Sequence, residues 1–148
     1  MGRLSRKQAK SWHTCANGHE RKNMPEGGCF CSAIRYQIDD GEYLVANCHC
    51  TMCRRTSGAP FVTWIVVPRE AFRYTRGTPR QLDSSAKGRR EFCAKCGTPL
   101  TFVTEERPDK IDITTGSLDD PEAFPPSVAV HEDVKLAWLS ATEPEAAP

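Results

Sequence analysis

The hydrophobic and polar positions of this chain alternate with the two-residue period of β-strands. In "IRYQI" the apolar side chains of Ile34, Tyr36 and Ile38 fall on one face and the polar ones on the other. The segment "KIDITTG" repeats this alternation with Ile111 and Ile113. Each pattern predicts a strand with its apolar side chains on one face.

Further strands are predicted from short apolar runs between turns. "PFVTWIVVP" (60–68) is rich in β-branched and aromatic residues throughout, which is typical of a strand buried on both faces. Shorter candidates are "FRYTRG" (72–77), "RREFC" (89–93), "PLTFVTE" (99–105) and "VKLAWLS" (134–140). Glycine and proline clusters separate these runs, and no segment has a long helical period. The sequence therefore predicts a mainly β domain.

The 148 residues suffice for one domain, which the pattern places at 27–140. Residues 1–26 are expected to form a poorly ordered basic arm, and 141–148 a flexible tail. The net charge of +1 argues against dedicated nucleic-acid binding, and no apolar run approaches the roughly 20 residues of a membrane span. The opening segment also lacks the apolar core of a secretory signal, so we expect a cytoplasmic protein.

Seven of the eight cysteines occur in tight clusters, which in a reducing compartment indicates metal binding. "CAKC" supplies Cys93 and Cys96 with the spacing of a zinc knuckle, and the glycine after it permits the tight turn. "CFC" can supply two more thiolates, Cys29 and Cys31. Four thiolates make a closed, saturated site that suits a structural metal, and such sites contribute roughly 10 to 16 kcal/mol in small zinc peptides.

The remaining cluster, "CHCTMC", provides Cys48, Cys50 and Cys53. Three thiolates can hold zinc and leave one tetrahedral position open, as in catalytic zinc sites. His49 is an alternative fourth ligand, although the middle side chain of an extended CxC segment points away from its neighbours. Further alternatives lie on the arm and are His13, Cys15 and His19. We expect the open site.

The donor set of this second cluster also indicates its chemistry. Zinc with three thiolates carries a net charge of about −1 and activates water less well than zinc held by neutral histidines. Its natural fourth ligand is another soft donor, and a thiol that coordinates zinc loses its proton. Because the thiolate is the nucleophilic form, such a site is suited to present a thiol substrate to an electrophile.

Four segments in this order, together with a final "AWL", closely resemble one family: "GGCFCSAIRYQI", "CHCTMCRRTSGAPF", "FCAKCGTPL" and "TGSLDDP". This is the glutathione-dependent formaldehyde-activating enzyme (Gfa) family, or CENP-V/GFA domain. The resemblance implies an Mss4-like fold, a zinc-bound β-tent of antiparallel sheets. It also implies two zinc ions per chain, a structural one on Cys29, Cys31, Cys93 and Cys96 and a catalytic one on Cys48, Cys50 and Cys53.

The activity implied by the resemblance is that of a carbon–sulfur lyase that joins glutathione and formaldehyde into S-(hydroxymethyl)glutathione. In this hypothesis Arg54 and Arg55 pair with a carboxylate of glutathione, and His49 relays a proton to the developing alkoxide. Two alternatives remain open. One is a non-catalytic zinc-binding interaction module, and the other is the same zinc site acting on another thiol and aldehyde pair. Self-association into a homo-oligomer also stays open.

Overall fold

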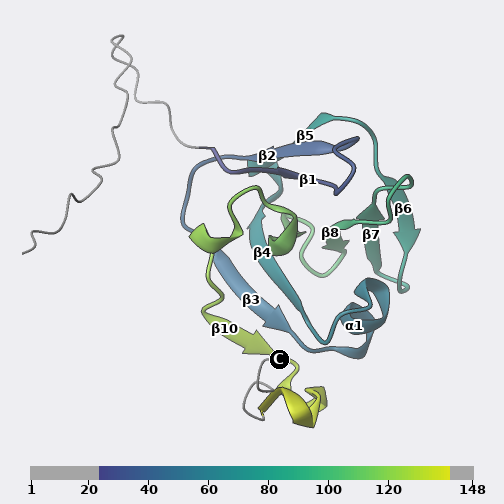
Figure 1. Cartoon of the computed structure of the whole chain (residues 1–148), viewed down its shortest axis with the longest axis vertical. Coiled ribbons are helices and arrows are strands. Elements are labelled where there is room, and N and C mark those ends of the chain that lie inside the picture. Colours follow the sequence, from purple (N-terminus) through teal and green to yellow (C-terminus); the bar gives the residue numbers. More distant parts are fainter. Residues whose placement is uncertain (1–23, 141–148) are drawn as a thin grey trace, which may run out of the picture.

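The computed structural model describes residues 24–140 and contains two β-sheets (Figure 1). The smaller sheet has the strand order β1-β2-β5, and the larger has seven strands in the order β10-β3-β4-β9-β8-β7-β6. The strands are β1 (Glu26–Gly28), β2 (Arg35–Ile38), β3 (Leu44–Cys48), β4 (Val62–Pro68), β5 (Phe72–Arg76), β6 (Arg80–Asp83), β7 (Gly88–Phe92), β8 (Pro99–Thr104), β9 (Lys110–Thr114) and β10 (Val128–Val130).

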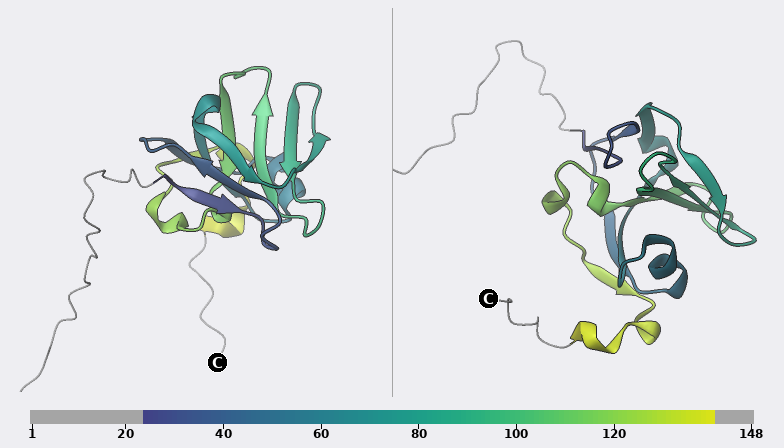
Figure 2. Two further views of the ribbon diagram at one scale, coloured as in Figure 1. Left: turned by 90° about the horizontal axis from the view of Figure 1, so that it is seen from above. Right: turned by 45° about the vertical axis from the view of Figure 1, so that its right-hand side comes forward.

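The described part has one α-helix, α1 (Thr51–Ser57), which follows β3. Short 3₁₀ turns complete the chain: η1 (Arg69–Ala71), η2 (Thr115–Ser117), η3 (Pro121–Ala123), η4 (Glu132–Val134) and η5 (Ala137–Ser140). Figures 1 and 2 show the smaller sheet lying across one end of the larger one, while α1 lies at the opposite end of β3 and β4. No helix in residues 24–140 is long and apolar enough to cross a membrane.

The prediction of a mainly β fold is confirmed, with two corrections. The larger sheet is mixed and not purely antiparallel, because β10 pairs parallel to β3. The strand predicted at 134–140 is wrong, since this segment forms 3₁₀ turns. Its alternating apolar residues have no sheet to cover, and Trp138 remains 60% exposed. Four strands were not predicted, namely β1, β3, β6 and β10. Strand β1 begins one residue before the expected start of the domain at residue 27. The domain boundaries themselves remain a prediction.

One face of the larger sheet packs against the smaller sheet and forms the main core. The alternation predicted for β2 is confirmed, because Ile34, Tyr36 and Ile38 are all buried in this core. From the larger sheet the core receives Val45, Ile65, Val67, Ile111 and Ile113. Burying this apolar area drives the two sheets together at roughly 25 cal/mol per Å².

The other face of the larger sheet carries a separate apolar cluster that includes cysteines. Cys48 pairs with Val62 across β3 and β4, and Trp64 follows two residues later on the same face. These residues, Cys53 of α1 and the partly buried Phe102 form the cluster. Thus the sheet separates a stabilising core on one side from a cysteine-containing surface on the other.

Replacing Gly27 by alanine should destabilise the junction between the sheets. Gly27 pairs with Tyr36 and bridges to Leu118, and an added Cβ would overlap the Tyr36 hydroxyl and the Ser117 carbonyl oxygen. We expect a loss of about 1 to 3 kcal/mol in the free energy of unfolding, the usual cost of overpacking. Urea unfolding of Gly27→Ala measures this effect.

The matched control is Gly116→Ala, whose added Cβ meets no atom within 4 Å. It should change the free energy of unfolding by less than about 1 kcal/mol. Equal destabilisation by both substitutions would contradict this account of the junction.

Candidate functional site

The first cysteine group contains Cys29, Cys31, Cys93 and Cys96, whose sulfur atoms all lie within 4.8 Å of one another. The Sγ atoms of Cys29 and Cys31 are 3.6 Å apart, and those of Cys31 and Cys93 are 3.8 Å apart. Four sulfurs around a zinc ion at about 2.3 Å are separated by roughly 3.8 Å, so these separations fit a tetrahedral metal site. A disulfide, at about 2.05 Å, does not fit them.

Two tight loops bring this group together. In the loop between β1 and β2, the backbone N–H of Ile34 donates to Cys29 Sγ at 3.3 Å. In the loop between β7 and β8, Gly97 has a φ of +79°, and its N–H donates to the carbonyl oxygen of Cys93 at 2.8 Å. Hydrogen bonds from the side chain and backbone of Thr98 lower the pKa of Cys96 to about 5. This group joins the smaller sheet to the larger one.

The second group contains Cys48, Cys50 and Cys53, with sulfur atoms within 4.8 Å of one another. Cys48 ends β3, Cys50 is the N-cap of α1, and Cys53 lies in the first turn of the helix. The sulfur of Cys50 accepts the backbone N–H of Cys53 at 3.3 Å, so the cap itself directs two thiols toward one point. Among the described histidines, cysteines and carboxylates, no fourth ligand atom joins this group.

A cavity of about 650 Å³ opens beside the three cysteines, which contribute to its wall. We call it the cysteine cavity. Its apolar lining includes Trp64, Val66 and Phe102. Its charged lining residues are Lys87, Arg90, Glu106, Arg107 and Asp112. The three thiols therefore face a space that a small molecule can enter, and the charged groups offer it polar contacts.

Arg90 lies in direct contact with the second cysteine group, and the sequence reasoning missed it. Its Nη2 atom is 3.6 Å from the Sγ of Cys53, and the residue is only 7% exposed. The guanidinium carbon lies 4.6 Å from the ring centroid of Phe102 and 5.7 Å from that of Trp64. Hydrogen bonding with Cys48 lowers the pKa of Cys53 to about 5, and the charge of Arg90 acts in the same direction.

Asp112 is a buried carboxylate on the wall of the same cavity, and it was also not predicted as a site residue. It is 7% exposed, and its Oδ2 accepts a hydrogen bond from Arg107 at 2.8 Å. Its Oδ1 has no partner in the described part of the chain. Burial raises the pKa of Asp112, although the interaction with Arg107 opposes this effect. The free oxygen can accept a hydrogen bond from a ligand.

The model of the family "glutathione-dependent formaldehyde-activating enzyme" matches residues 24–133, a segment that contains both cysteine groups and the cysteine cavity. The chain belongs to this family. The family assignment made from the four sequence motifs is thereby confirmed. Both cysteine groups of the chain can hold a metal ion.

Two further comparisons found similar proteins. An "uncharacterized lyase" of Schizosaccharomyces pombe is 32% identical over 82 residues, which is 54% of this chain and 59% of the relative. The chain thus matches somewhat more than half the length of that protein. A crystal structure of a Rhodobacter sphaeroides protein has a TM-score of 0.55 and 21% sequence identity, and the alignment covers 70% of this chain and 98% of the other. This likeness supports the fold alone.

His49 of this Gfa-family chain does not join the three thiols. Its side chain is 4% exposed and packs on Phe61 with ring centroids 5.4 Å apart. Its backbone N–H donates to the carbonyl oxygen of Val130, and its Nδ1 has no partner in residues 24–140. This placement agrees with the expectation that the middle residue of the CxC segment points away from its neighbours. Its role as a proton relay remains a prediction.

Arg54 and Arg55 lie on a different side of α1 from the cysteine cavity. They line a separate depression with Leu136 and Trp138. Arg54 donates to the Thr51 hydroxyl at 3.5 Å, within its own helix. Their role in binding a carboxylate also remains a prediction. The other proposed ligands, on the arm, lie outside the described residues.

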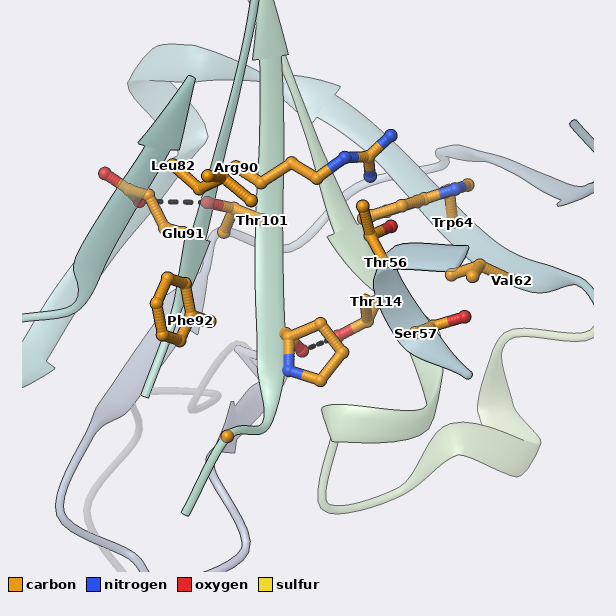
Figure 3. A pocket seen from close by; sticks show the side chains of 12 residues that line it. Thr56, Ser57, Val62, Trp64, Leu82, Arg90, Glu91, Phe92, Thr101 and Thr114 are labelled. Atoms are coloured by element: carbon orange, nitrogen blue, oxygen red, sulfur yellow. Dashed lines mark hydrogen bonds between the residues drawn. The ribbon is translucent and has the colours of Figure 1, made fainter. Parts of the chain in front are cut away.

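A second cavity of about 270 Å³ adjoins the first across Arg90 and Trp64, which line both (Figure 3). We call it the side cavity. Ser57 of α1, Val62 of β4 and Phe92 of β7 also line it. Figure 3 shows the guanidinium of Arg90 beside the Trp64 ring, at the boundary of this space. Arg90 therefore stands between two cavities of this Gfa-family protein.

Proposed function

We propose that this protein is a zinc-dependent carbon–sulfur lyase that condenses glutathione with formaldehyde to S-(hydroxymethyl)glutathione. The observation that carries this proposal is the difference between the two cysteine groups. One has four thiols, whereas the other has three thiols on the wall of a cavity and no fourth donor in the described residues. A saturated site supports structure, and a site with an open position supports turnover.

The residues present fit zinc at both positions. Cys29, Cys31, Cys93 and Cys96 would hold the structural ion, and Cys48, Cys50 and Cys53 the catalytic one. Zinc held by three thiolates supplies a centre at which an added thiol ionises. In the reaction, the thiol loses its proton and its sulfur forms a bond to the aldehyde carbon. The carbonyl electron pair moves to the oxygen, and that oxygen takes a proton.

The walls of the cysteine cavity can bind and orient a peptide thiol. Trp64 and Phe102 exclude water from one side and contact the apolar part of the ligand. Lys87 and Arg107 place positive charge on the wall, and glutathione carries two carboxylates. The free Oδ1 of Asp112 can accept an N–H from its amine or amide groups.

Two substitutions distinguish between two candidate binding sites for the carboxylates of glutathione, the cysteine cavity and the depression beside Arg55. Lys87→Met should weaken glutathione binding by about five-fold, roughly 1 kcal/mol, because Lys87 lines the cysteine cavity. Its ion pair with Glu106 is exposed and contributes little to stability, so the fold should be unaffected. Arg55→Met, outside the cavity, should change affinity by less than about two-fold.

Isothermal titration calorimetry with glutathione measures both effects. A larger loss of affinity in Arg55→Met than in Lys87→Met would place the carboxylate site on the outer side of α1. That is the site expected from the sequence, at Arg54 and Arg55. Unchanged binding in both variants would remove Lys87 and Arg55 from the account of glutathione recognition.

The reaction itself is tested by NMR exchange spectroscopy with ¹³C-formaldehyde and glutathione. The zinc-loaded protein should accelerate exchange between free formaldehyde and the hydroxymethyl adduct above the uncatalysed rate. A protein that carries both metal ions and leaves this exchange rate unchanged is not a lyase for this pair. In that case, faster exchange with another thiol or aldehyde would mean that the same site acts on a different substrate pair. If no pair exchanges faster, the non-catalytic zinc-binding module is the better interpretation.

A further inference from the structure

Arg90 is a buried cation whose hydrogen-bonding capacity is largely unused. It is 7% exposed, and no carboxylate in the described residues lies within ion-pair distance of it. Its one hydrogen bond in that part of the chain is from Nη2 to Cys53 Sγ, and its Nε is buried without a partner. A guanidinium has five N–H donors, so most of them remain available to a ligand.

The aromatic rings beside Arg90 hold the group in place without using those donors. Phe102 and Trp64 contact the guanidinium through their faces, at 4.6 and 5.7 Å from the ring centroids. Such contacts stabilise the cation, while the N–H groups point outward in the plane of the guanidinium. Because Arg90 lines the cysteine cavity, a ligand in that cavity can reach these donors.

The other cations of the cysteine cavity already have acidic partners. Arg107 pairs with Asp112 at 2.8 Å, and Lys87 pairs with Glu106 at 3.4 Å. Arg90 instead contacts Cys53 of the three-thiol group, which would carry a net charge of about −1 with zinc bound. The positive charge of Arg90 would partly neutralise this negative charge. A second negative charge that forms beside the group would be stabilised by the same guanidinium.

We propose that Arg90 is a catalytic residue that binds the carbonyl oxygen of the aldehyde and stabilises it as it becomes an alkoxide. This inference rests on the proposed function. When the sulfur of the thiol bonds to the aldehyde carbon, the carbonyl electron pair moves to an oxygen only two bonds from that sulfur. Arg90 already contacts a sulfur of the site, so its free donors lie close to where this oxygen forms. The oxygen then takes the proton released by the thiol.

A carboxylate of glutathione is a poorer occupant for these donors. The carboxylates lie several bonds from the sulfur, toward the parts of the ligand that extend away from the thiols. Lys87 is 60% exposed at its side chain and Arg107 is 44% exposed, which suits charged groups near the solvent. Arg90 is deeper, next to the sulfur and two aromatic rings, where a donor has its largest effect on a developing charge.

The test replaces Arg90 by methionine, which keeps an apolar chain beside the two rings and removes the charge. Arg80→Met, on the exposed edge strand β6, is the matched control. In the Arg90→Met variant the NMR exchange rate should fall by about 100- to 1,000-fold, the usual cost of losing one such donor. The dissociation constant for glutathione alone should change by less than about three-fold.

Two further measurements separate a catalytic role from a structural one. Zinc content should remain two ions per chain, and in the cobalt-substituted protein the sulfur-to-cobalt band should shift when the Arg90 hydrogen bond to Cys53 is removed. Arg90→Lys keeps the charge without the planar guanidinium, and it should recover part of the lost exchange rate. This variant carries the same test if the methionine variant does not fold.

The results separate the two proposals. Wild-type exchange rates in Arg90→Met or Arg90→Lys, with an active wild-type protein, would overturn the role of Arg90 alone. An equally large loss of glutathione affinity would assign Arg90 to the thiol and also overturn it. A wild-type protein that does not accelerate exchange would overturn the proposed function, and this inference with it.

Discussion

Replacing Cys93 by serine should leave the domain unfolded or insoluble. Cys93 belongs to the four-thiol group, which joins the β1–β2 loop of the smaller sheet to the β7–β8 loop of the larger one. A structural zinc contributes roughly 10 to 16 kcal/mol, whereas whole domains are stable by about 5 to 15 kcal/mol. Losing one of its four ligands therefore removes an energy comparable with the total stability.

Circular dichroism and soluble yield measure this effect, with Cys53→Ser as the matched control. Cys53 belongs to a group that holds only the end of β3 and the start of α1, so its loss should be milder. Equal collapse of both variants, or one zinc per wild-type chain, would contradict the division into a structural and a catalytic site.

Cys50→Ser should abolish catalysis and leave the fold intact. Cys50 is the N-cap of α1, and serine is among the best N-cap residues, so the helix keeps its cap while the site loses a thiolate. We expect one zinc per chain, an unchanged unfolding transition and an NMR exchange rate at the uncatalysed level. Elemental analysis, thermal unfolding and the exchange measurement test these three expectations.

A serine at an exposed position of α1 provides the control for Cys50→Ser. Thr56→Ser retains the hydroxyl that bonds the carbonyl oxygen of Met52 and should keep both metal ions and the exchange rate. Substantial exchange by Cys50→Ser at one zinc per chain would place the reaction outside the three-thiol group.

The sequence predicts the strands whose residues alternate and lie in the core, because their pattern records which face is buried. Ile34, Tyr36 and Ile38 are an example, and their burial is confirmed. The sequence of strand β10 shows no such alternation between a buried and an exposed face, since Val128 and Val130 are both partly exposed. Its parallel pairing with β3 also depends on a long connection, which the local pattern does not reveal. The segment around Trp138 alternates as well, yet it has no neighbouring strand to pair with.

For the site, ligand spacing predicts the division of seven cysteines into groups of four and three, which the structure also shows. Adjacency in sequence is a poor guide to the rest. Arg54 follows Cys53 directly, but one step along a helix turns the side chain by about 100°, and the arginine lies outside the cavity. Arg90 reaches Cys53 from β7, a contact that only the sheet register brings about. In "RREFC", Arg90 is two residues before the apolar Phe92, so the two side chains lie on the same face of the strand. This alternation was the one feature of the sequence that could have pointed to a buried Arg90.

The most direct measurement of the central claim, that the three-thiol site captures a thiol through its sulfur, is a calorimetric comparison of glutathione with its S-methyl derivative. Both ligands carry the same charged groups, but only glutathione can become a thiolate. We expect the derivative to bind at least tenfold more weakly. We also expect glutathione binding to release a proton, so that the measured heat varies with the ionisation enthalpy of the buffer. Equal affinities without proton release would contradict thiolate capture and favour a non-catalytic zinc module.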